Sequence, residues 1–389
     1  MGLIIQSIIV FGIIIWLMTY FGKIAYKWQY PQGYGGIDTF KNKRISFLTL
    51  FIKSYYVIPI FVFCLFAAVR YRVGVDCESY KELFYQIQKF GSLQTRESIE
   101  FLYKYLCNVV GYLTGTHYLL LFVLAMLQIV LYYYGLKKHT YLLVFLSFAL
   151  FFTNTYWSWM NGIRQNIAAC AFVAVTPLII KKKWINIALI TFAAMLMHKS
   201  ALIILPLSVL GYLLRNFAPN KYIQLGVLAM SFLFMNKFNN ILSSISYLAA
   251  KAGYNERSIT LYTELEESTR NFGARMVLLY IVYVICIFYY ERMRKYFNSK
   301  EFNLWYNLHF IGICLTVVFY NNFTITRVLY YLVIFTPIII SHLLFYLYNN
   351  KKKVIFNTVL IILALGFMYT LYNSLNNPAT EAFLYKFDI

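Results

Sequence analysis

The chain is short of charge, and above all of negative charge. Only 13% of its 389 residues are charged, against about 25% in a typical soluble protein. The 14 acidic residues stand against 35 lysines and arginines, while hydrophobic residues make up 61% of the chain. A soluble globular domain is excluded by this composition. In a soluble protein the net charge of +21 would indicate nucleic acid, but here the loops explain it better, and we expect no nucleic-acid partner.

The usual motifs for metals and nucleotides are also missing. The six cysteines form no C-x-x-C pair, and the five histidines are far apart in the sequence, so we expect no metal site. Pro31–Gly36 (P-Q-G-Y-G-G) is rich in glycine but lacks the Lys-Ser/Thr pair of a phosphate loop. We therefore expect no cofactor, and the energy for any reaction would come from an activated donor.

Long apolar runs are what the chain does have. Runs of roughly 15–22 residues recur along it, which is typical of an all-α, polytopic integral membrane protein with a single transmembrane domain over residues 1–389. The first run, Met1–Tyr20, has no basic residue before it and no cleavage site, so it reads as a retained helix. The apolar segments lie near 3–20, 47–68, 118–135, 140–153, 164–180, 184–197, 200–214, 221–236, 274–290, 302–320, 326–348 and 353–372.

Basic residues gather in alternate short loops between these segments. Lysines and arginines concentrate on the cytoplasmic side of membrane proteins, and placing the basic clusters there predicts about twelve transmembrane helices with both termini outside. Lys53 is then the one basic residue inside a helix. The positive charge is mostly a consequence of topology, with some attraction to anionic membrane lipids. The clusters are Lys23 to Arg44, Lys137 and Lys138, Lys181–Lys183, Arg215 and Lys221, Arg292 to Lys300, and Lys351–Lys353.

Two external stretches are predicted beside the spans. Ile99–Leu113 is apolar, but it is too short to span comfortably and carries two charges, so we interpret it as interfacial or re-entrant. Glu78–Phe90 has an amphipathic pattern with one apolar stripe. Residues 69–117 therefore form an external amphipathic or re-entrant layer, and residues 237–273 form an external loop. The stripe consists of Tyr80, Leu83, Phe84 and Ile87.

A set of cations lies at or just inside the predicted external boundary. Charges so close to hydrocarbon are costly and usually line a cavity or pair with one another, and arginine suits bidentate binding of diphosphate oxygens. An arginine near a helix end also reaches lipid headgroups with no other role, and Asp76 could simply pair with a neighbouring arginine. Several cations against the positive-inside bias nevertheless favour a ligand. They are Arg70, Arg72, Arg164, His198, Arg275 and Arg327.

The densest cluster of charge resembles a known signature. The signature segment, Arg70–Tyr80 (R-Y-R-V-G-V-D-C-E-S-Y), is similar to the R-x-x-x-G-x-D-x-x-x-Y pattern of EpsG-type, Wzy-like O-antigen and exopolysaccharide polymerases. Weaker matches follow in the family's order. They are Glu97–Glu100 with Tyr103, Asn161–Gln165 (N-G-I-R-Q), His198–Leu202 (H-K-S-A-L), and Thr326-Arg327 with Tyr330.

The resemblance implies a metal-independent glycosyltransferase of the bacterial inner (cytoplasmic) membrane. Its active site would face the periplasm or exterior and join undecaprenyl-diphosphate-linked repeat units into O-antigen, capsular polysaccharide or exopolysaccharide, alongside a chain-length regulator and a flippase. Either Asp76 or His198 would be the general base. Substrate binding would fall to Arg70, Arg72, Gly74, Tyr80, Glu100, Arg164, Gln165 and Arg327.

Other functions compete with this interpretation. A flippase or transporter of lipid-linked oligosaccharide would have basic residues deep in its helices and a pseudo-repeat between its halves, and apart from Lys53 neither is visible. Another lipid-linked-donor membrane glycosyltransferase, or an acyltransferase, stays open, because Asp76 and Glu78 supply the pair of acids that dolichol-phosphate-type enzymes place in the first external loop. A structural or assembly protein would leave the external cations unexplained.

Overall fold

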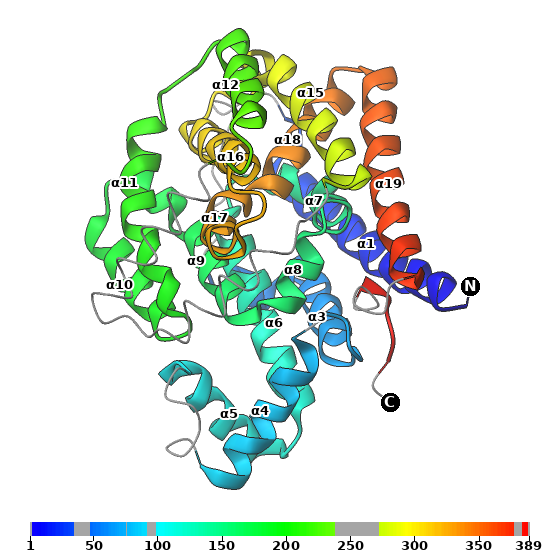
Figure 1. The fold of residues 1–389 in the computed structure, drawn as a ribbon, viewed down its shortest axis with the longest axis vertical. Helices are drawn as coiled ribbons and strands as arrows, with labels where there is room; N and C mark the ends of the chain where they lie inside the picture. The colour runs from blue at the N-terminus through cyan, green and yellow to red at the C-terminus, as the bar shows by residue number, and fades with distance from the viewer. Residues whose placement is uncertain are drawn as a thin grey trace.

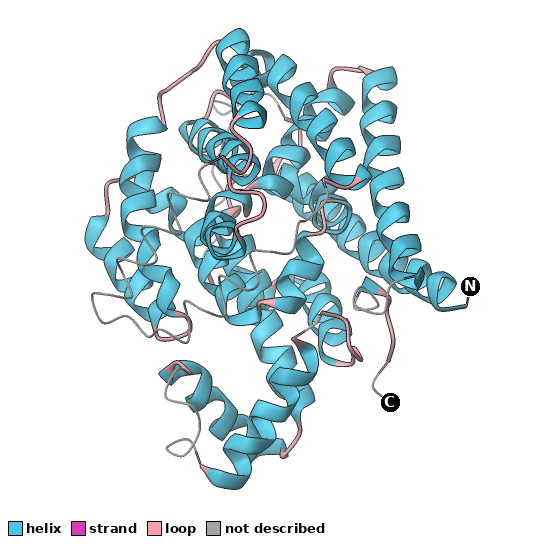
Figure 2. Cartoon of the chain, in the orientation of Figure 1, coloured by secondary structure: helices cyan, strands magenta, loops and turns pink. Residues whose placement is uncertain are grey.

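The structure is a computed structural model that describes residues 2–34, 47–74, 76–91, 99–237, 272–376 and 383–387. Every regular element in these ranges is a helix, apart from one isolated bridge between Arg70 and Phe387 (Figure 2). The predicted all-α fold is confirmed. The predicted external loop at 237–273 lies almost wholly outside the described residues.

The first part of the chain, up to residue 180, forms the helices α1 to α9 and one 3₁₀ turn (Figure 1). They are α1 (Gly2–Gln29), α2 (Thr49–Ile52), α3 (Ser54–Ala68), α4 (Cys77–Phe90), α5 (Phe101–Thr114), α6 (His117–Gly135), the 3₁₀ turn η2 (Thr140–Leu142), α7 (Leu143–Phe152), α8 (Thr155–Asn161) and α9 (Ile163–Ile180).

The second part of the chain also consists of helices, both short and long. They are α10 (Trp184–Met195), the 3₁₀ turn η3 (Lys199–Ile203), α11 (Ile204–Leu214), α12 (Lys221–Leu233), α15 (Ala274–Phe297), α16 (Lys300–Val318), α17 (Phe323–Val333), α18 (Thr336–Asn349) and α19 (Lys353–Asn376).

The core forms around α9 and α18, whose side chains are buried almost throughout. Small residues let the α9 backbone approach its neighbours closely, as is common between membrane helices. A Cβ on Gly135 of α6 would lie only 2.5 Å from the carbonyl oxygen of Val173 on α9. The α6–α9 crossing therefore depends on the absence of a side chain at this position.

Fewer helices than predicted are long and apolar enough to span a membrane in the described ranges. Six helical segments in the described ranges are long and apolar enough to cross a membrane, or seven if the bent pair α7–α8 counts as one span. Each predicted apolar segment does contain a helix, but the twelve predicted spans are not confirmed. The helices α10, α11 and α12 have 12, 11 and 13 residues. At about 1.5 Å per residue they are shorter than a hydrocarbon core of about 30 Å.

Two local predictions are wrong. Lys53 lies in no helix, because its extended backbone (φ −84°, ψ 123°) separates α2 from α3 and its side chain is exposed. The segment from Asn154 to Asn161 lies between the predicted apolar segments 140–153 and 164–180, so the sequence predicts a short loop there, but it is mostly the helix α8. It meets α7 at an angle of 66°, and the bend occurs where Asn154 adopts a left-handed conformation (φ 60°).

The helices α4 and α5 form a pair at one end of the molecule, beside α6 (Figure 1). The predicted apolar stripe of α4 makes the contact, since Phe84 and Ile87 are buried in one cluster with Tyr103 and Cys107 of α5. The pair corresponds to residues 69–117, for which we predicted an external layer. Its position relative to a membrane stays a prediction.

The C-terminal segment, residues 383–387, packs beside the start of the signature segment. The Tyr71 amide donates to the Lys386 carbonyl at 2.8 Å, the Tyr385 hydroxyl donates to the Phe66 carbonyl at 2.6 Å, and the Tyr385 amide donates to the Ser7 hydroxyl at 2.8 Å. The end of the chain therefore joins the beginning of α1 to the end of α3.

Candidate functional site

A polar cavity of about 330 Å³ lies where four separate parts of the chain meet. These parts are the start of α4, the α8–α9 junction, the turn between α10 and η3, and the first turns of α17. All four carry the motifs singled out from the sequence. The lining residues are Asp76, Tyr80, Ser158, Asn161, Gly162, Arg164, Gln165, Asn166, His198, Thr326, Arg327 and Tyr330.

Arg70, the first residue of the signature segment, is buried behind this cavity and does not line it. Only 1% of its surface is exposed. Its guanidinium donates to the carbonyls of Ala67, Val73 (3.0 Å) and Met160 (3.4 Å). Because these carbonyls occupy it, the side chain stabilises the end of α3 and its contact with α8. The predicted role in diphosphate binding does not fit this position.

Arg72 does not line the cavity either. Its side chain is 62% exposed, and its Nε lies 4.0 Å from a carboxylate oxygen of Glu78. An exposed ion pair of this kind contributes little to stability. The predicted phosphate-binding role is thus not supported at Arg72, which makes it a useful control position.

The middle of the signature segment packs directly on α8. Gly74 has φ +90°, and a Cβ there would lie 2.7 Å from the Met160 carbonyl oxygen. Two residues later, the Asp76 amide donates to the Asn161 side-chain oxygen at 2.9 Å. Because Gly74 has no side chain, the signature segment can approach the backbone of α8 closely. Together the two contacts place the Asp76 carboxyl group at the cavity.

Gly74→Ala should lower the thermal stability of the purified protein, because both the left-handed backbone and the contact with Met160 oppose a side chain. Strain of this type costs about 1–3 kcal/mol. Gly91→Ala is the matched control, since Gly91 has φ +78° and nothing within 4 Å of its Cβ position. Unfolding temperatures measured in detergent should fall further for Gly74→Ala. Equal losses would contradict the proposed contact with α8.

Glu100 connects three donors beside the cavity. It is the residue before α5, and its own surface is only 8% exposed. One carboxylate oxygen accepts from Arg164, while the other lies 2.9 Å from Nδ1 of His198 and 3.2 Å from the Lys199 amide. The Arg164 guanidinium also lies over the Tyr103 ring, 5.4 Å from its centre. Glu100 therefore holds Arg164 and His198 at the cavity wall. It is not among the residues that line the cavity, and its predicted contact with substrate stays a prediction.

The two carboxyl groups have opposite electrostatic environments. Burial alone would raise the pKa of Glu100, but the bond with His198 and the charge of Arg164 outweigh it and lower the pKa to about 2. Burial raises the pKa of Asp76 above its usual value, and the charges of Arg327 and Arg164 offset only part of that rise. Glu100 is thus a permanent anion, whereas Asp76 is a carboxyl group suited to proton transfer.

The α17 side of the cavity is held by its helix cap and by α9. The Asn322 side chain accepts from the Ile325 amide at 2.9 Å, which begins α17. Gln165 of α9 donates to the Arg327 carbonyl at 2.5 Å. Gln165 lines the cavity beside Arg327 and aligns the two helices that carry the cavity arginines.

Two smaller cavities, with volumes of about 190 and 150 Å³, neighbour the main cavity along α8. Arg275, at the start of α15, lines both, and Ser158 lines both of these and the main cavity. With the Asn154 amide oxygen turned toward α15, three guanidinium nitrogens of Arg275 lie 2.7–3.2 Å from it. The left-handed Asn154 therefore orients a further cation beside the main cavity.

Sequence reasoning and geometry agree on part of the site. The structure brings Asp76, Tyr80, Arg164, Gln165 and His198 together with Arg327, although they come from distant parts of the chain. It adds neutral donors that sequence reasoning did not assign. Asn166, for example, donates to the carbonyls of Ser158 (2.6 Å) and Gly162 (2.8 Å) and secures the α8–α9 turn. The repeated asparagines around N-G-I-R-Q were the available signal.

The site is a cationic and hydroxyl-rich cavity in a chain whose long apolar helices indicate a multi-pass membrane protein. Within the described ranges, no three His, Cys, Asp or Glu residues are grouped as metal ligands. A model of the EpsG family matches residues 53–387. The chain therefore belongs to the EpsG family, which indicates a polysaccharide polymerase-type function. No curated protein and no solved structure matched the chain.

Proposed function

We propose that this protein polymerises undecaprenyl-diphosphate-linked oligosaccharide repeat units on the outer face of the inner (cytoplasmic) membrane. The observation that carries the proposal is the convergence of four motif-bearing segments on one cavity, with two arginines, a carboxyl group and a histidine in its wall. Membership of the EpsG family supports the same type of reaction. Fixed cations suit a lipid diphosphate, and a half-buried carboxyl group suits proton transfer.

The proposed reaction is a glycosyl transfer. The bond between the donor's anomeric carbon and its diphosphate oxygen breaks, and a bond forms between that carbon and a hydroxyl of the acceptor unit. The hydroxyl proton passes to the protein, and undecaprenyl diphosphate leaves with the bonding electron pair. Arg164 and Arg327 stabilise the charge that develops on the leaving diphosphate, as preorganised donors do in other transferases.

Asp76 is the general base in this proposal. Its carboxyl group lines the cavity with both arginines, and burial raises its pKa toward the range that suits proton transfer. His198 is the second candidate, because its Nδ1 is engaged by Glu100 and the other ring nitrogen remains for a substrate hydroxyl. The acid limb of the pH–rate profile distinguishes these two candidate bases.

Polymerisation needs two lipid diphosphates at once, one on the donor and one on the acceptor. Arg275 and Arg164 line neighbouring cavities that share Ser158 and Asn161 of α8. We place the donor diphosphate at Arg164 and Arg327 and the acceptor diphosphate at Arg275. Arg275→Gln should then weaken the use of acceptor, with a smaller effect on donor binding. A chain-length regulator and a flippase would act beside the polymerase.

Deletion of the gene tests the function. A polymerase mutant should show surface glycans of one repeat unit and no ladder of longer chains, and the wild-type gene should restore the ladder. Complete loss of surface glycan, with lipid-linked units retained inside the cell, would instead support a flippase. An unchanged ladder would contradict both.

A further inference from the structure

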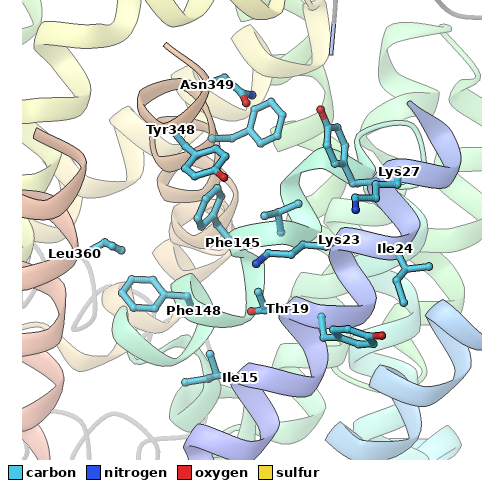
Figure 3. Close-up of a pocket in the computed structure, with 14 residues that line it drawn as sticks. Ile15, Thr19, Lys23, Ile24, Lys27, Phe145, Phe148, Tyr348, Asn349 and Leu360 are labelled. Atoms are coloured by element: carbon cyan, nitrogen blue, oxygen red, sulfur yellow. The ribbon is translucent and has the colours of Figure 1, made fainter. Parts of the chain in front are cut away.

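A second large cavity lies between α1, α7, α18 and α19, away from the candidate site (Figure 3). Its volume is about 590 Å³, within the range of about 300–1,000 Å³ that is typical of small-molecule sites. One part of the wall is apolar and is formed by Ile15, Phe145, Phe148 and Leu360. The other part carries the lysines of α1. The cavity therefore has an apolar part and a positively charged part, as a site for the hydrocarbon chain and the anionic headgroup of a lipid would have.

The charged end consists of Lys23 and Lys27, which are one helical turn apart and so share a face of α1. Both ammonium groups extend toward the interior of the cavity, and the Tyr348 hydroxyl faces them from α18 (Figure 3). The described residues that line the cavity include no aspartate or glutamate. Two lysines and a hydroxyl beside an apolar chamber suit a phosphate group with an attached hydrocarbon chain.

The position of the two lysines along α1 separates this cavity from the candidate site. Ser7 accepts from the Tyr385 amide, and the same C-terminal segment pairs with Arg70, so the beginning of α1 lies near the signature segment. At about 1.5 Å per residue, Lys23 and Lys27 lie about 24 and 30 Å further along α1. A hydrocarbon core is about 30 Å thick. The lysines thus lie toward the membrane face opposite the candidate site.

We infer that this cavity binds an anionic glycerophospholipid of that leaflet. Its headgroup phosphate lies between Lys23 and Lys27, and one acyl chain follows the phenylalanines of α7 toward Leu360 of α19. A substrate diphosphate is excluded as the occupant, because the reacting end of such a lipid must reach the arginines at the other face. Basic pockets between membrane helices on the cytoplasmic side are known to bind anionic headgroups.

The bound lipid would join α1 to the rest of the fold. The helix α1 lies outside the residues matched by the family model, which begin at 53. Along the cavity it faces α19 without filling the space between them. An acyl chain in that space supplies apolar contacts to both helices, so occupancy should raise the unfolding temperature. The binding of an anionic phospholipid rests on the cavity and its lysines, and only the exclusion of a substrate diphosphate rests on the proposed function.

Native mass spectrometry of the purified full chain tests the site, with phosphatidylglycerol and phosphatidylcholine of identical acyl chains as the probes. We expect one retained phosphatidylglycerol, a higher unfolding temperature in its presence, and little retention of phosphatidylcholine. Lys23→Gln with Lys27→Gln should weaken phosphatidylglycerol binding on the order of tenfold. The matched control is Lys351→Gln with Lys352→Gln, which removes two exposed lysines from the neighbouring α18–α19 turn and should retain binding.

A second variant tests the acyl chain. Leu360→Trp fills the apolar end and leaves both lysines in place, so it should also lose the retained lipid while keeping its helical content by circular dichroism. Equal retention of the two phospholipids, unchanged binding in the double lysine variant, or preferential retention of undecaprenyl phosphate would each overturn the inference.

Discussion

Glu100→Gln should abolish polymerisation and cause a large loss of stability. The buried carboxylate accepts from Arg164, faces Nδ1 of His198 at 2.9 Å and accepts from the Lys199 amide. Glutamine keeps the shape but brings an amide donor against existing donors and leaves the guanidinium without its anion. Removing one partner of a buried ion pair costs about 3–5 kcal/mol. Because Arg164 and His198 both line the cavity, the variant should also lose the diphosphate site.

The pH dependence of this loss has a defined sign. The pKa of Glu100 is lowered from 4.5 to about 2, so its ionised form is favoured in the folded protein. The stabilisation is fully present above pH 4.5 and disappears as the pH falls through about 2. Wild type and Glu100→Gln should therefore differ most in unfolding temperature at neutral pH and converge in acid.

Glu78→Gln is the matched control for this experiment. Glu78 faces the exposed Arg72 at 4.0 Å, and a surface pair of this kind contributes about 0–1 kcal/mol. The two variants make the same chemical change, so their difference reports the buried network. Equal unfolding temperatures for the two variants at pH 7 would show that Glu100 does not hold the site together.

The apolar helices were predictable because every backbone amide within a membrane must be bonded inside its own segment. That rule locates helices but does not say how far each one reaches. In the sequence, the stretches 184–197, 200–214 and 221–236 looked like the other apolar segments that we predicted to span the membrane. They form helices of only 12, 11 and 13 residues. Their lengths depend on turns such as the one at His198, where a side chain bonds to a residue 98 positions away.

The site shows the same division between local and long-range information. The positions of Arg164 and Arg327 in a cavity wall were predictable, because a charge close to hydrocarbon is costly and usually lines a cavity or pairs with another group. The roles of Arg70 and Glu100 were not, because both depend on partners that only the fold supplies. Arg70 looked equivalent to Arg164, but its guanidinium is occupied by carbonyls of α3, the following loop and α8. Glu100 looked like a ligand, and its contact with Arg164 crosses 64 positions of sequence.

Asp76→Asn should lower the polymerisation rate about 10²–10⁴-fold, the usual contribution of a general base, with little change in unfolding temperature. The structural contact of Asp76 runs through its backbone amide, 2.9 Å from the Asn161 oxygen, and asparagine preserves it. Its side chain does not cap α4. Rates can be measured with lipid-linked repeat units extracted from the deletion strain. A large drop in stability together with the rate would contradict a catalytic role and favour a structural one.

The acid limb of the pH–rate profile identifies the base. Burial raises the pKa of Asp76, while the charges of Arg327 and Arg164 lower it, so removing a charge must raise that pKa further. Arg327→Gln should move the acid limb to higher pH, in addition to weakening substrate binding. Arg72→Gln removes an exposed guanidinium outside the cavity and should leave the limb in place. If the limb persists in Asp76→Asn and disappears in His198→Gln, the proton goes to His198, and Asp76 serves only to position the signature segment.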